Sequence, residues 1–72
     1  METDYKSEDR ARILSYLSGR AGKRVSVREL KESSGANPLR VYPLLFELEE
    51  EGALEVVERE EMGAPEWVRV GK

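Results

Sequence analysis

One short segment of the sequence places the end of a helix almost directly before the start of another. Ser33-Ser34-Gly35 is typical of a helix end, because glycine adopts the left-handed conformation that terminates helices. Asn37-Pro38 is typical of a helix start, since asparagine caps the exposed amides and proline lacks the N–H that a first turn leaves unpaired. Two helices joined by so short a glycine-containing turn form a helix-turn-helix. No other feature restricts the fold as strongly.

A first helix is predicted to begin at Ser7, which would serve as N-cap with Glu8 and Asp9 in the first turn. Its apolar stripe follows helical spacing and ends before Gly19, with members Ile13, Leu14 and Leu17. Residues 1–6 are therefore expected to be a flexible N-terminus, and residues 7–72 a single domain.

The other two helices also carry boundary signals. Ser26 and Glu29 have the spacing of a capping box, in which each side chain satisfies an amide of the first turn. The third helix is predicted over residues 37–51, ended by Gly52, with an apolar stripe at Val41, Leu44, Leu45 and Leu48. Pro43 lies inside it and is expected to loosen or kink the first turn, because proline cannot bond to the carbonyl of Leu39.

Two β-branched and aromatic runs follow, over residues 53–58 and 66–70, with Gly63-Ala64-Pro65 as the turn between them. A further short strand is expected at Lys23-Arg24-Val25. The order helix, short strand, helix, helix, hairpin predicts a mainly α fold of the α+β class. We interpret it as a winged helix-turn-helix with three helices and a two- or three-stranded antiparallel wing, the hairpin spanning residues 54–70.

The third helix and the hairpin resemble those of the PadR-like transcriptional regulators. The residues that match the family pattern are Tyr42, Pro43, Leu45, Leu48, Glu49, Gly52 and Leu54. The resemblance implies a DNA-binding transcriptional regulator. PadR-like regulators usually continue into a C-terminal helix that dimerises and lines an effector pocket, whereas this sequence ends at Lys72. The resemblance therefore implies a short form without that helix. The family's dimer contacts and effector binding do not carry over to this sequence, in which no small-molecule effector is evident.

The Pro65-Glu66-Trp67 segment also resembles the wing of Zα domains, which bind left-handed nucleic acid. That family needs an asparagine and a tyrosine four apart on the third helix. This sequence has Tyr42 and Phe46 there, so the second resemblance is the weaker.

Charge is distributed unevenly along the sequence. Residues 1–36 have eight basic and six acidic residues, net +2, and residues 37–72 have four basic and nine acidic residues, net −5. The total of −3 disfavours nucleic acid, but a basic run precedes the second helix. Charged residues make up 38% of the chain, cysteine is absent and Asn37 is the single amide side chain, a composition typical of thermophile proteins.

DNA contacts are predicted at the start of the third helix, which enters the major groove in this motif. Arg40 is the candidate for guanine, while Leu39 and Pro43 share its face. Asn37 is primarily the cap, and Tyr42 either reaches a phosphate or lies half-buried. The remaining predicted contacts, to phosphate or the minor groove, are Lys23, Arg24, Ser26, Arg28, Arg59 and Arg69.

Other functional classes are less favoured. The sequence has no histidine or cysteine, so we expect neither an enzyme nor a metal or other cofactor. Without a run of about 20 apolar residues or a leader, we expect a soluble, cytoplasmic protein. The main alternative is a winged-helix protein-interaction module of a larger assembly that does not bind DNA. Sequence-specific binding would favour a homodimer, with either the N-terminal segment or the first-helix residues Tyr5, Ile13 and Tyr16 as candidate contacts.

Overall fold

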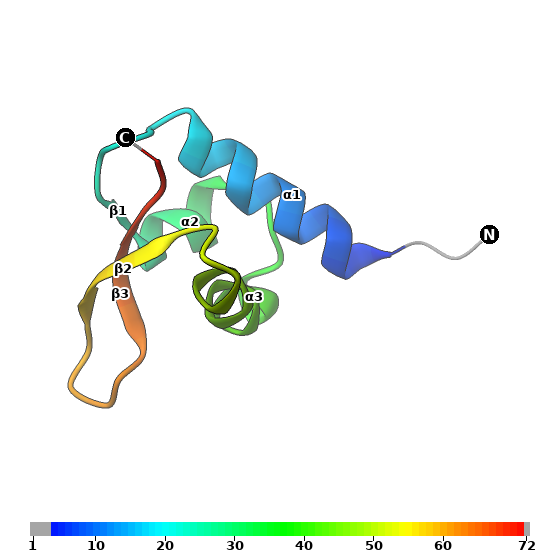
Figure 1. The fold of residues 1–72 in the computed structure, drawn as a ribbon. Coiled ribbons are helices and arrows are strands. Elements are labelled where there is room, and N and C mark those ends of the chain that lie inside the picture. The colour runs from blue at the N-terminus through cyan, green and yellow to red at the C-terminus, as the bar shows by residue number, and fades with distance from the viewer. Residues whose placement is uncertain (1–3, 72) are drawn as a thin grey trace.

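The structure is a computed structural model and describes residues 4–71. It contains three helices and three strands (Figure 1), in the order α1 (Tyr5–Ser18), β1 (Val25–Ser26), α2 (Val27–Ser33), α3 (Pro38–Glu51), β2 (Glu55–Arg59) and β3 (Pro65–Arg69). This order confirms the expected α+β class and winged-helix arrangement. None of the described helices is long and apolar enough to cross a bilayer.

The wing is a three-stranded antiparallel sheet in the order β1-β3-β2. Val25 pairs with Val68 across the β1–β3 ladder, and the β2–β3 ladder shifts register on either side of Glu58. The short strand lies at Val25–Ser26 rather than at residues 23–25. Ser26 therefore has two roles, because it ends β1 and also caps α2.

The start of α1 differs from the expectation. Asp4 is the N-cap, and its carboxylate accepts hydrogen bonds from the Ser7 amide at 3.1 Å and the Ser7 hydroxyl at 2.7 Å. Ser7 is thus a donor to the cap, not the cap itself. The expected flexible segment 1–6 is wrong for residues 4–6, which form the cap and first turn of α1; its residues 1–3 lie outside the described residues.

The caps at the starts of α2 and α3 form at the predicted residues. The Ser26 hydroxyl accepts from the Glu29 amide at 3.0 Å, and the Asn37 side-chain oxygen accepts from the Leu39 amide at 2.9 Å. Gly35 has a φ of +86°, a conformation that side-chain-bearing residues rarely adopt. The capping box is only half formed, because the Glu29 carboxylate binds the Tyr16 hydroxyl and Arg20 instead of the Ser26 amide.

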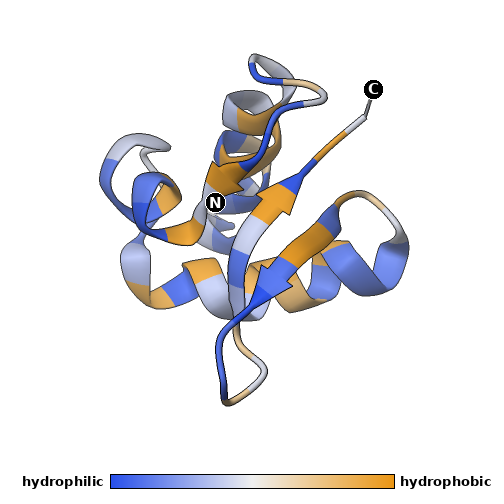
Figure 2. Ribbon diagram, turned by 90° about the vertical axis from the view of Figure 1, so that its left-hand side faces the viewer, coloured by the Kyte–Doolittle hydropathy of each residue, from blue (hydrophilic) through white to orange (hydrophobic). Residues whose placement is uncertain are grey.

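The inner faces of all these elements form one core, and Figure 2 shows hydrophobic segments recurring in the helices and the strands between hydrophilic ones. The predicted stripe of α3 is fully buried, and α3 continues through Pro43 without a break. The core comprises Ile13, Leu17, Val25, Val27, Leu30, Ala36, Val41, Leu44, Leu45, Leu48, Leu54, Val68 and Val70. Ile13 is wholly buried here, so its proposed role as a dimer contact is wrong.

Leucine-to-alanine substitutions on the two sides of α3 should differ strongly in their effect on the free energy of unfolding. Leu45→Ala should lower the free energy of unfolding by about 2–5 kcal/mol, because Leu45 is fully buried and the change leaves a cavity. Leu39→Ala should change it by less than about 0.5 kcal/mol, because that side chain is 87% exposed. Urea unfolding followed by Trp67 fluorescence measures both, and similar losses in the two variants would contradict this orientation of α3.

Candidate nucleic-acid interface

The outward face of α3 is apolar at its start and acidic toward its end. Leu39, Pro43 and Phe46 follow one another at helical spacing, and the Phe46 side chain is 46% exposed. Glu47 and Glu50 continue the same face toward the C-terminal end of the helix. Only the first two turns therefore present a surface without carboxylates.

Arg40, the predicted base contact, is bound to another part of the protein. Its guanidinium donates a hydrogen bond of 3.0 Å to the carboxylate of Asp9 on α1 and lies over the Tyr5 ring, 5.7 Å from the centroid. Arg12 donates to the other oxygen of Asp9 at 3.2 Å. Asp9 is buried, so these two arginines compensate a charge that has little access to water.

The surroundings of Asp9 stabilise its ionised form. Burial raises the pKa of the carboxyl group, but the hydrogen bond from Arg40, the backbone hydrogen bond from Asn37, the charge of Arg40 and the hydrogen bond from Arg12 outweigh burial. The pKa of Asp9 is therefore lowered from its ordinary value of 3.8. Because Asn37 and Arg40 both belong to the start of α3, this carboxylate fixes that end of the helix against α1.

Tyr42 lies half-buried between α3 and the wing. Its hydroxyl donates to the carboxylate of Glu60 at 3.3 Å, and the Nζ of Lys31 lies 4.2 Å from its ring centroid. Tyr42 is half-buried under the wing, and its contact with a phosphate stays a prediction. The hydroxyl is directed to the wing, and the nearby cation comes from α2.

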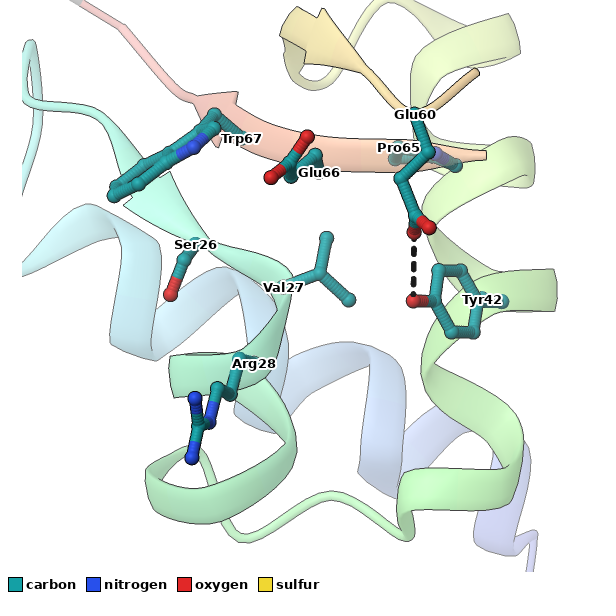
Figure 3. A pocket seen from close by; sticks show the side chains of 8 residues that line it. All are labelled: Ser26, Val27, Arg28, Tyr42, Glu60, Pro65, Glu66 and Trp67. Carbon is teal, nitrogen blue, oxygen red and sulfur yellow. Dashed lines mark hydrogen bonds between the residues drawn. The ribbon is translucent and has the colours of Figure 1, made fainter. Parts of the chain in front are cut away.

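A surface hollow of about 320 Å³ separates the start of α2, the middle of α3 and the hairpin. Figure 3 shows Arg28 at its edge, with the guanidinium directed away from Glu60 and Tyr42. Glu60 and Glu66 line the hollow together with Trp67. Two carboxylates disfavour a phosphate inside it, so a phosphate contact of Arg28 would lie at the rim.

The basic residues around the start of α2 differ in how they are engaged. Lys23 is exposed and forms no ion pair with any residue in the range 4–71. Arg28 is 87% exposed and has one distant partner, Glu32, at 3.5 Å. Arg24 is more constrained, since it pairs with Glu58 at 3.1 Å and lies over the Trp67 ring.

The two wing arginines are paired with carboxylates. Arg59 binds Glu49 of α3 and donates to the Gly63 carbonyl at 3.0 Å. Arg69 pairs with Glu55 at the base of the hairpin. These contacts link the hairpin to α3 and its two strands to each other, and either arginine would have to leave its partner to reach a nucleic acid.

The structure thus exposes Arg28 at the rim of the hollow, holds Arg40 against α1, and pairs the wing arginines within the fold. Sequence reasoning missed Lys31 and Asp9. Lys31 follows Arg28 by three positions and therefore shares its helix face. The described residues include no group of three or more ligand side chains arranged to hold a metal ion.

Comparison with models of known protein families gives no match, and comparison with curated protein sequences gives none either. The resemblance to PadR-like regulators therefore stays a prediction.

The lowered pKa of Asp9 gives its contribution to stability a definite pH dependence. The contribution is fully present above the unfolded-state value of 3.8 and is lost as the pH falls through the lower folded-state pKa. Asp9→Asn should therefore lower the free energy of unfolding at neutral pH, and the gap from wild type should close below that window. Urea unfolding at a series of pH values measures the gap.

Glu50→Gln is the matched control for Asp9→Asn, because it neutralises an exposed carboxylate. Its effect should be small at every pH. A gap between wild type and Asp9→Asn that stays constant into acid would show that Asp9 does not stabilise the fold through its charge.

Proposed function

We propose that this protein is a double-stranded DNA-binding regulator of transcription that places the first two turns of α3 in the major groove. The observation that carries the proposal is the exposed, carboxylate-free start of α3, presented as the second helix of a helix-turn-helix beside a wing. Helix-turn-helix proteins read base edges with this part of the recognition helix.

The cations of α2 supply the phosphate contacts in this proposal. Arg28 is exposed at the rim of the hollow, and Lys31 lies against Tyr42 at the side of α3. Lys23 extends the basic surface toward the loop before β1. Contacts of this kind position a protein on the duplex without reading its sequence.

The acidic residues limit how the duplex can lie. Glu47 and Glu50 on α3 would repel phosphates near the C-terminal half of the helix, and Glu60 and Glu61 would do the same near the tip of the hairpin. The proposed duplex therefore follows α2 and the start of α3. The salt sensitivity of binding would therefore reflect contacts with only a few phosphates.

A protein-interaction module is the second candidate, and two observations favour it. The outward face of α3 exposes apolar side chains, Leu39 and Phe46, as protein interfaces do. Most arginines of the proposed DNA surface also have carboxylate partners already. A module of this kind would show no salt-sensitive DNA affinity, so the measurement below separates the two candidates.

A two-fold dimer is part of the DNA proposal, because one such domain covers one half-site. Of the three contacts expected on α1, Tyr5 is exposed, Tyr16 is half-buried and bound to Glu29, and Ile13 is in the core. Tyr5 is therefore the favoured contact. Sedimentation of Tyr5→Ala against wild type, with and without duplex DNA, tests it.

DNA binding should weaken as salt rises, because each neutralised phosphate releases counterions. Arg28→Gln and Lys31→Gln should each lower the slope of log affinity against log salt by about 0.9, the value for one phosphate contact. Fluorescence anisotropy with a labelled duplex over a salt series measures the slope.

Arg10→Gln is the control for these two variants. It removes the same kind of charge, but Arg10 pairs with Glu51 beyond the proposed interface, so the slope should not change. If wild type binds no duplex even at low salt, the DNA proposal is rejected and the protein-interaction candidate takes its place.

A further inference from the structure

The first two turns of α3 offer few polar groups to a base pair. The Asn37 side-chain oxygen caps the helix, the Tyr42 hydroxyl donates to Glu60, and Arg40 is bound to Asp9. The side chains that project outward there are those of Leu39 and Pro43, one turn apart on the same face. A protein that contacts base pairs with this surface does so through apolar side chains.

Base pairs differ in what they offer such a surface. In the major groove guanine, cytosine and adenine present hydrogen-bonding groups, which need polar partners, whereas thymine adds the apolar methyl group on C5. We infer that this protein reads the 5-methyl groups of pyrimidines through Leu39, with Pro43 beside it, and so prefers thymine-containing duplexes. The inference rests on the proposed function and deepens it by naming the chemical group that is read.

The charges around this apolar face favour DNA as its ligand. On the neighbouring α2, Lys31 lies over the ring of Tyr42, the residue before Pro43, and Arg28 is exposed at the rim of the hollow, so both are available to a phosphate strand. Glu47 and Glu50 confine contact to the first two turns. Leu39 and Pro43 are about 6 Å apart along the helix axis, against about 3.4 Å between successive bases of a strand. The pair Leu39 and Pro43 therefore spans one or two neighbouring thymines.

Guanine recognition through Arg40 is less favoured by the same contacts. Reaching a base would require Arg40 to leave Asp9, a buried carboxylate that would then keep Arg12 as its one side-chain partner. A buried charge that loses a partner is costly. Leu39 needs no such rearrangement, because its side chain is already exposed.

The test compares duplexes that differ only in the 5-methyl group. An alternating A·T duplex of about 20 base pairs, two helical turns, is compared with the same duplex containing uracil in place of thymine. A G·C duplex is compared with its 5-methylcytosine form. Wild type should bind each methylated duplex more tightly, by about fourfold for each methyl group buried, which corresponds to about 0.8 kcal/mol.

Two variants assign the effect to a side chain and a groove. Leu39→Ala should bind thymine and uracil duplexes alike while keeping the salt slope of wild type. Met62→Ala removes an apolar side chain that is 96% exposed in the turn of the hairpin. The 5-methyl group lies in the major groove, so a wing contact in the minor groove cannot sense it. Met62→Ala should therefore keep the full preference for thymine.

The outcomes separate this inference from the proposed function. Equal, salt-sensitive binding of thymine and uracil duplexes by wild type would overturn methyl reading and leave DNA binding intact. A preference that persists in Leu39→Ala would also overturn it, because the preference would then come from the shape of the duplex. Absence of binding to all four duplexes would reject the proposed function and methyl reading with it.

Discussion

The carboxylate of Asp9 ties the start of α3 to α1 and holds the arginine of that segment. It is the one charged group buried within residues 4–71, and its partners come from α1 itself and from the start of α3. A buried carboxylate cannot be left unpaired without a large cost, so Arg40 is retained against α1. Burial of Val41, Leu44, Leu45 and Leu48 sets which side of α3 faces outward, and the contact with Asp9 adds a polar attachment of the start of α3 to α1. The apolar character of the exposed start of α3 follows from it, because the one cation of that segment points elsewhere.

Local signals were sufficient to predict most of the fold. Ser26, Asn37 and Gly52 act on amides or carbonyls within a few residues of themselves, so their roles could be inferred before any tertiary contact was known. The start of α1 was predicted incorrectly, although the spacing of Asp4 and Ser7 is that of a side-chain cap and its amide partner. The polar composition of the first residues hid that signal.

The candidate site was harder to predict because its chemistry depends on distant partners. Arg40 pairs with a residue 31 positions away, and Arg24 with one 34 positions away. No local pattern shows which cations such contacts will occupy. Asp9 was missed although a local signal was present, because it lies four residues before Ile13 and eight before Leu17, on the buried face of α1. A charged residue in that stripe predicts a buried ion pair. Exposed ion pairs contribute little stability, about 0–1 kcal/mol each, so the others chiefly fix where the charges lie.

The separation of the two faces of α3 has a consequence for how such proteins diverge. The residues that hold the fold and those that face outward, such as Leu39 and Phe46, are different residues of one helix. The first group is Val41, Leu44, Leu45 and Leu48. Natural selection can therefore alter the ligand of the domain without altering its folding. A family of paralogues built on this scaffold would keep the inner stripe and vary the outer one, and a library randomised at the outer positions would retain folded members.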